Sequence, residues 1–166
     1  MEPDAPTTGP SDLRVVARGD APVPDPAAAP VAWLVDGYNA LHVGLLRGAA
    51  RAGAWWSAEG REALLARVRR FEGGAGRVAV VFDGPDAREL PDPGAAGAEA
   101  GRARVVFAPS ADAWLLRRAG AAAPGEVVVV TADRRLAARA RARGATVVSP
   151  QDFLARCPEE RPGGSV

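Results

Sequence analysis

The sequence predicts an α/β fold, in which an open, mostly parallel sheet of five strands carries helices on both faces, giving three layers. Two observations indicate this fold. Short and nearly continuous apolar runs recur along the chain, as is typical of parallel strands that are buried on both faces. Helical segments separate most of these runs, and parallel strands need such crossovers to join them.

Five segments have the pattern of buried strands, because they are short, rich in Val and almost free of polar residues. The first two end in an acidic residue, Asp36 and Asp83, and the fifth is the weakest. In chain order the expected strands span residues 31–36, 78–83, 103–107, 126–131 and 145–149.

Four helices are expected between and after these strands. Ser57 is a suitable N-cap for a helix that runs through Phe71, because apolar residues recur every three or four positions between the two. Ser149, followed by a proline and by Asp152, announces a short final helix. The three helices after the first are expected at residues 112–120, 134–143 and 150–155, and glycines close the first two of these three.

The domain boundaries follow from changes in composition. Residues 1–30 are rich in Pro and Ala and have little apolar periodicity, so we expect a disordered arm. Residues 31–156 form the expected folded domain, and residues 157–166 a flexible C-terminal tail. Residues 84–102 are rich in Gly, Pro and Ala, and this long connection predicts a mobile flap or a poorly defined helix.

Composition limits the classes of function. The chain has 48% hydrophobic and 25% charged residues, all of its 21 basic residues are Arg, and its formal net charge is +1. Because the first thirty residues hold more acids than Arg, the rest carries a positive excess, which suits either a polyanionic partner or simple solubility. Cys157 is the single cysteine, which excludes a disulfide within one chain and favours a reducing compartment. We find no leader or membrane-spanning pattern, so we expect a cytoplasmic protein without a membrane partner.

Four aspartates fall where the carboxyl ends of the strands should meet. Asp36 and Asp83 end their strands, Asp133 follows the fourth strand, and Asp112 lies in the first turn of the helix after the third strand. Ligands bind in the crevice at this edge of an open parallel sheet. Clustered carboxylates repel one another unless a cation neutralises them, and oxygen ligands without His or Cys select Mg²⁺ or Mn²⁺. Hydrolysis of phosphodiesters is the chemistry that such a site predicts. Taken singly, each aspartate could instead shape a turn or cap a helix.

Several other residues could have either a functional or a purely structural role. Arg134 and Arg135 could contact phosphates or form a solvated helix face. Aromatic residues could stack on bases, but packing is favoured for Trp55, Trp56 and Trp114. His42 is the only histidine and is better read as a packed or surface residue than as an acid or base. Binding of ATP or NAD is disfavoured, because no glycine pattern for phosphates follows Gly37 and the chain has no Lys.

The tetrapeptide Asp36-Gly-Tyr-Asn39 resembles the opening motif of the NYN domain family of PIN-like ribonucleases, close to its small bacterial YacP-like branch. The likeness extends over most of the predicted domain. It includes the segments 81–84, 106–107, 110–112, 131–133, 144–145, 149 and 153–154. The resemblance implies a PIN-like fold and a metal-dependent endonuclease acting on RNA, expected to be single-stranded, with a ribosome or an RNA-processing complex as further candidate partners.

Residue by residue, the resemblance assigns Asp36, Asp112 and Asp133 as ligands of Mg²⁺ or Mn²⁺. Asp83 matches the acid at the end of a strand in the family, and Asn39 matches the polar residue beside the first metal ligand. Asn39 could also cap a helix, and the two roles are compatible. All five are therefore candidate catalytic residues. Weaker candidates for substrate binding are Thr131, which resembles the residue that supports the last acidic loop, and the two arginines Arg134 and Arg135.

One departure from the family pattern leaves a second function open. Relatives often carry a further acid beside the position of Asp112, where this chain has Ala113. The alternative is therefore an RNA-binding or regulatory module with weak or absent catalysis. A phosphatase with an aspartate nucleophile is a third class, but it needs a second Asp where this sequence has Tyr38.

Overall fold

The computed structural model describes residues 32–45, 57–74, 77–84, 88–91 and 103–159. The expected arm over residues 1–30, Trp55 and Trp56 lie outside these ranges. Five parallel strands form the body of the sheet, as predicted. They are β1 (Ala32–Asp36), β2 (Val78–Asp83), β4 (Arg104–Ala108), β5 (Val127–Val130) and β6 (Thr146–Val148).

A sixth strand corrects the prediction for the connection after β2. Residues 88–91 were expected within a flap or a poorly defined helix, but they form β3 (Arg88–Pro91), which pairs antiparallel with β4. β3 lies at the edge of the sheet, where a proline such as Pro91 removes no hydrogen bond from a central ladder. The fold class is confirmed, with one edge strand more than predicted.

The strands lie in the order β3-β4-β2-β1-β5-β6. From β1 the chain first proceeds outward through β2 and β4, and it then crosses to β5 and β6 on the other side of β1. The direction of winding therefore reverses between β1 and β5. Such a switch point opens a crevice at the carboxyl ends of the strands.

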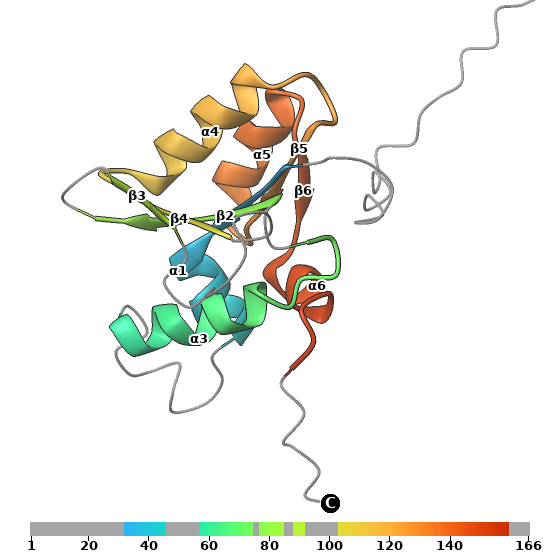
Figure 1. Cartoon of the computed structure of the whole chain (residues 1–166). Coiled ribbons are helices and arrows are strands. Elements are labelled where there is room, and N and C mark those ends of the chain that lie inside the picture. The colour runs from blue at the N-terminus through green and yellow to red at the C-terminus, as the bar shows by residue number, and fades with distance from the viewer. Residues whose placement is uncertain (1–31, 46–56, 75–76, 85–87, 92–102, 160–166) are drawn as a thin grey trace, which may run out of the picture.

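The helices cover both faces of the sheet, as Figure 1 shows. On one face lie α4 and α5, and on the other face lie α1, α3 and α6. The segment η1 continues α1 as a π-helical stretch and packs with α3 and α6. Their bounds are α1 (Gly37–Asn39), η1 (Ala40–Leu45), α3 (Ala58–Val68), α4 (Ala111–Ala121), α5 (Arg134–Ala142) and α6 (Pro150–Ala155).

The predicted serine caps are confirmed by hydrogen bonds, whereas the predicted closure by Gly120 is wrong, because Gly120 lies inside α4, which ends at Ala121. The Ser57 hydroxyl accepts from the backbone N–H of Gly60, and the Ser149 hydroxyl accepts from that of Asp152. The helix from Ser57 ends at Val68, three residues before Phe71, and Phe71 itself packs in the core. Beyond α5, Gly144 has φ +89°, a left-handed conformation that ends a helix and that glycine adopts without strain.

Alternation along the strands divides the core into two clusters. On the α3 side the largest buried side chains are Trp33, Phe82 and Phe153, and on the α4 side Leu115 and Leu136. Successive residues of a strand point to opposite faces, so each strand supplies both clusters. No helix within the described ranges is long and apolar enough to cross a membrane.

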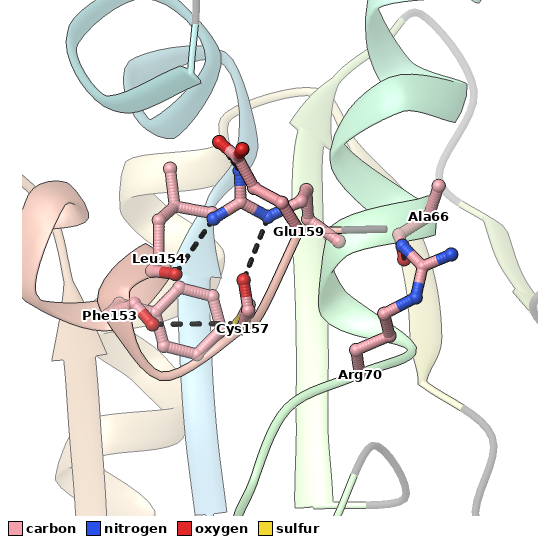
Figure 2. Close-up of polar contacts among 7 residues, drawn as sticks. Ala66, Arg70, Phe153, Leu154, Cys157 and Glu159 are labelled. Atoms are coloured by element: carbon pink, nitrogen blue, oxygen red, sulfur yellow. Dashed lines mark hydrogen bonds and ion pairs between the residues drawn. The ribbon is translucent and has the colours of Figure 1, made fainter. Parts of the chain in front are cut away.

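The packed domain extends past the predicted boundary at residue 156. Cys157 is fully buried, and its thiol lies 3.5 Å from the carbonyl oxygen of Phe153, to which it donates (Figure 2). The Arg67 side chain of α3 donates to the carbonyl oxygens of Cys157 and Leu154, at 2.8 and 3.0 Å, and forms an ion pair with Glu159. These contacts attach residues 157–159, which were expected in the flexible tail, to the body of the domain.

Candidate functional site

The acids that end β1 and β2 point toward the α4 side of the sheet. In β1, Leu34 packs in the α4-side core and Val35 in the α3-side core, so alternation directs Asp36 back toward α4. In β2, Val81 and Phe82 alternate in the same way, which directs Asp83 to the same side. Because β1 and β2 are neighbours in the sheet, both carboxylates lie at one edge.

Gly37 is required by the close approach of the chain to β2 after Asp36. A Cβ atom at this position would clash with the Phe82 ring and would lie 2.9 Å from the carbonyl oxygen of Val81. Both contacts are closer than a carbon side chain tolerates. The glycine that follows Asp36 therefore lets α1 start directly above the neighbouring strand, which brings Asn39 back toward the strand ends.

Thr131 links the first acid to the last acidic loop. It follows β5, the other neighbour of β1, and only 3% of its surface is exposed. Its hydroxyl lies 3.2 Å from Asp36 Oδ2, to which it donates, and it accepts from the backbone N–H of Asp133 at 3.1 Å. These contacts make Thr131 a support for the acids, the role that the resemblance implied for it, and its weaker assignment to substrate binding stays a prediction.

Asn39 joins α1 to the same loop. Its side-chain oxygen accepts from the backbone N–H of Ala132 at 2.7 Å, and it lies 3.5 Å from the Thr131 hydroxyl. The hydrogen bond from Ala132 identifies this atom as the oxygen, so the amide NH₂ group is the end of Asn39 that is available to a ligand. An amide there adds no negative charge to an edge that already holds several carboxylates.

Asp83 positions the helix that carries Asp112. Its Oδ1 accepts from the backbone N–H of Ala111 at 2.9 Å, at the start of α4. The Ser110 hydroxyl caps the same helix by accepting from Ala113. Asp112 is exposed in the first turn of α4, as predicted, and thus comes from a helix that Asp83 holds to the end of β2.

Asp133 is the N-cap of α5. Its Oδ1 accepts from the backbone N–H groups of Arg135 and Leu136 at 2.8 and 3.0 Å. The capping role that sequence reasoning allowed for this residue is therefore real. It uses one carboxylate oxygen, so the second remains able to face a ligand.

Electrostatic coupling shows that the four acids act on one another. The pKa of Asp36 is raised to about 7, chiefly by burial and also by the charges of Asp112 and Asp83, while the Thr131 hydroxyl and the Asn39 backbone N–H oppose the rise. The pKa of Asp112 is also raised, by partial burial and by the charges of Asp133 and Asp83. The edge thus concentrates negative charge that a cation would relieve.

The donor set suits a hard divalent cation, although the acids are not closed around one point. Within the described part of the chain, no three Asp, Glu, His or Cys side chains are close enough to hold one ion together. Mg²⁺ is commonly held by one or two carboxylates and keeps several of its waters, which matches a site built on Asp36 and Asp112. The three-ligand set of Asp36, Asp112 and Asp133 stays a prediction.

One positive residue near the acids was not selected from the sequence. The charge of Arg139, on α5, lowers the pKa of Asp112 and so partly offsets the rise. Arg134 and Arg135, which were selected, are exposed at the start of the same helix. Spacing is the signal that was missed, because residues four apart share a helix face and Arg139 follows Arg135 by four.

Two other candidates take the packing roles that were favoured for them. Trp114 is half-buried against the α4-side core, with the Arg118 guanidinium 5.7 Å from its ring centroid. His42 is half-buried on η1.

A hollow of about 390 Å³ opens beside Ala32 and Glu126, at the amino-terminal edge of the sheet, and none of the predicted site residues lines it.

Comparison with known proteins agrees with this fold. Residues 33–162 match the family model described as the YacP-like NYN domain. The chain is also similar to the crystal structure of a mutant of Rae1 (YacP) from Bacillus subtilis, with a TM-score of 0.54 and 24% sequence identity over 76% of this chain and 73% of that one. No curated protein matches the sequence significantly. Because the family model covers most of the chain, the protein belongs to the YacP-like NYN domain family, whose fold is that of the PIN-like ribonucleases.

Proposed function

We propose that this protein is an endoribonuclease that depends on Mg²⁺ or Mn²⁺ and hydrolyses phosphodiester bonds of single-stranded RNA at the carboxyl edge of its sheet. Membership of the family supports ribonuclease activity in general. The observation that carries the finer proposal is the coupling of four carboxylates at the switch point, where Asp36 is buried and Asp112, Asp83 and Asp133 add negative charge.

In this proposal Asp36 and Asp112 hold the ion, with Asp133 beside them and Asp83 fixing the start of α4. A bound divalent ion would lower the pKa of a water molecule and offset the charge that develops on the scissile phosphate. Asn39 would orient a phosphate or a water molecule through its amide NH₂ group. Thr131 keeps Asp36 and the loop before α5 in register through its two hydrogen bonds.

The structure gives weight to one other function. Because no three acidic side chains in the described residues close around one point, a catalytically weak RNA-binding or regulatory module is the alternative. The two functions differ in what the metal does. An enzyme needs the ion for turnover, whereas a binding module retains RNA when the ion is chelated.

The test compares the wild type with Asp36→Asn on an end-labelled pool of single-stranded RNA, in Mn²⁺, in Mg²⁺ and in EDTA. Asp152→Asn is the matched control, because Asp152 is exposed on α6, which lies on the face of the sheet opposite α4 and α5. We expect cleavage by the wild type and by the control with either metal, and none by Asp36→Asn or in EDTA.

A second measurement separates metal binding from cleavage. Mn²⁺ should raise the melting temperature of the wild type, because a ligand that binds the folded state stabilises it, and should raise that of Asp36→Asn much less. A folded wild type that gains stability from Mn²⁺ but cuts no RNA would support the binding module.

We further propose a cytoplasmic location, since a buried and unpaired Cys157 suits a reducing compartment.

A further inference from the structure

Three exposed arginines of α5 and its C-cap lie in a row along one side of the helix. They are four residues apart, and residues at that spacing share a helix face. At about 1.5 Å per residue, the row spans about 12 Å along the helix axis. It begins in the first turn, next to the Asp133 cap, and ends at the C-cap. The arginine row consists of Arg135, Arg139 and Arg143.

The arginine row faces α4, which packs beside α5 on the same face of the sheet (Figure 1). The charge of Arg139 lowers the pKa of Asp112, so Arg139 lies near the first turn of α4. Near the other end of α4, a Cβ atom on Gly120 would lie 3.6 Å from Cδ of Arg143. The row therefore runs from the acidic edge to the opposite end of the two helices.

No acid among the described side chains forms an ion pair with the arginine row. Neither α5 nor β6, which packs beside it, contains an acid. The acids of α3 and α6 lie on the opposite face of the sheet. Beyond the far end of the row, Glu126 Oε2 accepts from the backbone N–H of Ala123. Arg143 donates to the carbonyl oxygen of Arg139 at 3.1 Å, which uses one of the five donors of a guanidinium. The row thus keeps its charge and most of its donors.

The stability of α5 does not account for this arrangement. Like charges four residues apart on a helix repel each other, and the arginine row contains two such pairs. Arg135 lies in the first turn, where the positive end of the helix dipole disfavours a cation. A polyanion bound along α5 would remove both kinds of repulsion. The charges of the row are therefore explained by a partner rather than by the fold.

The position and length of the arginine row fit a single strand of RNA. The row starts at the acidic edge, where a positive track offsets the repulsion that four carboxylates exert on a polyanion. At a rise of about 3.4 Å per stacked nucleotide, its span of about 12 Å corresponds to about three to four nucleotides. Contacts with phosphates position a strand without reading its sequence.

We propose that the arginine row binds successive phosphates of a single-stranded RNA whose scissile bond lies at the acidic edge. This inference rests on the proposed function, since the acidic edge gives the bound strand its starting point. It assigns the RNA path to the side of α5 that faces α4. The row acts on affinity, and the acids act on cleavage.

The test measures binding of a fluorescent single-stranded RNA oligomer in EDTA, so that no cleavage occurs, at several salt concentrations. Arg139→Gln and Arg143→Gln should each raise the Kd by about threefold to fivefold at low salt and reduce the salt slope by about 0.7. The double variant should reduce the slope by about 1.4.

Arg141→Gln is the matched control. It removes the same charge from an exposed residue of the same helix, but Arg141 is two residues from both Arg139 and Arg143 and so lies on the other side of α5. It should raise the Kd by about twofold or less, because its charge is separated from the bound strand by the helix and by solvent.

Three further measurements guard against a structural effect. The row variants remove like-charge pairs, so their melting temperatures should equal or exceed that of the wild type. Arg139→Lys should keep most of the affinity, because a lysine binds phosphate as a point charge. With Mn²⁺ present, Arg143→Gln, at the end of the row away from the acids, should raise KM and leave kcat nearly unchanged. A purely structural role would lower the melting temperature and leave KM as it is.

The outcomes separate this inference from the proposed function. If the wild type cuts RNA and both row variants keep its Kd and KM, the inference is overturned and the nuclease stands. If the wild type binds RNA without cutting it and the row variants bind more weakly, the path along α5 is supported and the nuclease is not. If Arg141→Gln weakens binding as much as Arg139→Gln does, the effect is one of net charge, and the inference is overturned. A wild type that neither binds nor cuts RNA overturns both.

Discussion

Asp36 combines two properties that are rarely found together in a side chain, because it is nearly buried and lies beside other acids. Only 8% of its surface is exposed, and one of its oxygens faces the buried Thr131 hydroxyl. An ionised carboxylate in such a place is costly unless a cation accompanies it. The folded protein without metal therefore holds a proton on Asp36 up to a pKa of about 7.

The pH dependence of stability follows from this proton. Below an unfolded pKa of 3.8 both states are protonated, and Asp36 costs nothing. As the pH rises toward about 7, the unfolded state releases the proton and the folded state keeps it, so the free energy of unfolding falls. Above about 7 the whole cost is present, on the order of 4 kcal/mol.

Asp36→Asn removes this titration. In EDTA we expect the variant to be more stable than the wild type at pH 8, and the two to be nearly equal at pH 4. Urea unfolding at both pH values measures the difference. A difference that is the same at pH 4 and pH 8 would mean that Asp36 ionises normally in the folded protein.

Thr131 is the second residue whose role is narrow enough to test alone. Thr131→Val keeps the shape and removes the hydroxyl, which leaves Asp36 Oδ2 and the backbone N–H of Asp133 without this partner. We expect a loss of about 1–3 kcal/mol in the free energy of unfolding. Thr131→Ser keeps the hydroxyl and should lose less. Equal losses for the two variants would assign the effect to packing of the methyl group.

At the scale of the elements, the turn from β1 into α1 sets the geometry of the edge. α1 begins at Gly37 in direct contact with Phe82 of β2, and it carries both Tyr38 and Asn39. Asn39 then bonds to the loop before α5. A single short turn thereby connects β1, β2 and α5 around Asp36.

Two glycine variants test this arrangement. Gly37→Ala should lower the free energy of unfolding by about 1–3 kcal/mol, because its Cβ would meet the Phe82 ring and the Val81 carbonyl oxygen. Gly120→Ala is the matched control, because Gly120 is an exposed residue of α4. A Cβ atom there would lie 3.6 Å from its nearest neighbour, an atom of the flexible Arg143 side chain. It should raise stability by about 0.5–1 kcal/mol, as expected for a helix interior. A neutral Gly37→Ala would show that α1 can move away from β2.

At the scale of the whole molecule, the Arg67 side chain helps to attach the C-terminal segment, residues 154–159, to the α3 layer. Arg67 donates to the carbonyl oxygen of Leu154, in the last turn of α6, and to that of Cys157, just beyond the helix (Figure 2). The Leu154 oxygen also accepts from the backbone N–H of Cys157, at 2.9 Å. Cys157 is buried, and burial raises the pKa of its thiol to about 12. This cysteine therefore fills the core and is not a reactive thiol.

The contacts of Arg67 with the C-terminal segment predict a difference between Arg67, in the last turn of α3, and Arg69, the residue just after that helix. Arg67→Gln should lower the free energy of unfolding by about 1–3 kcal/mol, because the carbonyl oxygens of Leu154 and Cys157 lose the guanidinium, and that of Leu154 keeps only the backbone N–H of Cys157. Arg69→Gln breaks the exposed pair with Glu62 and should change stability by about 0.5 kcal/mol or less. Thermal unfolding of both variants measures this. Similar melting temperatures would mean that water replaces the guanidinium at both carbonyl oxygens.

The sequence by itself determined the fold class, the five parallel strands, the capped helices and the family. The periodicity of apolar residues and the presence of helix-capping residues are local signals. The Val-rich runs therefore predicted strands directly, and residues such as Ser57 and Ser149 predicted helix starts. It also placed Asp36, Asp83, Asp112 and Asp133 at strand and helix ends, because the carboxyl edge of a parallel sheet follows from strand order along the chain.

Only the tertiary structure decided what depends on neighbours that are distant in sequence. β3 became a strand through pairing with β4, which no local pattern announced. Burial by neighbouring elements raised the pKa of Asp36, and packing brought the Thr131 hydroxyl between Asp36 and the backbone N–H of Asp133. The position of Arg139 beside Asp112 emerged in the same way. A side chain's charge is visible in the sequence, but the field that acts on it comes from elements that only packing brings together.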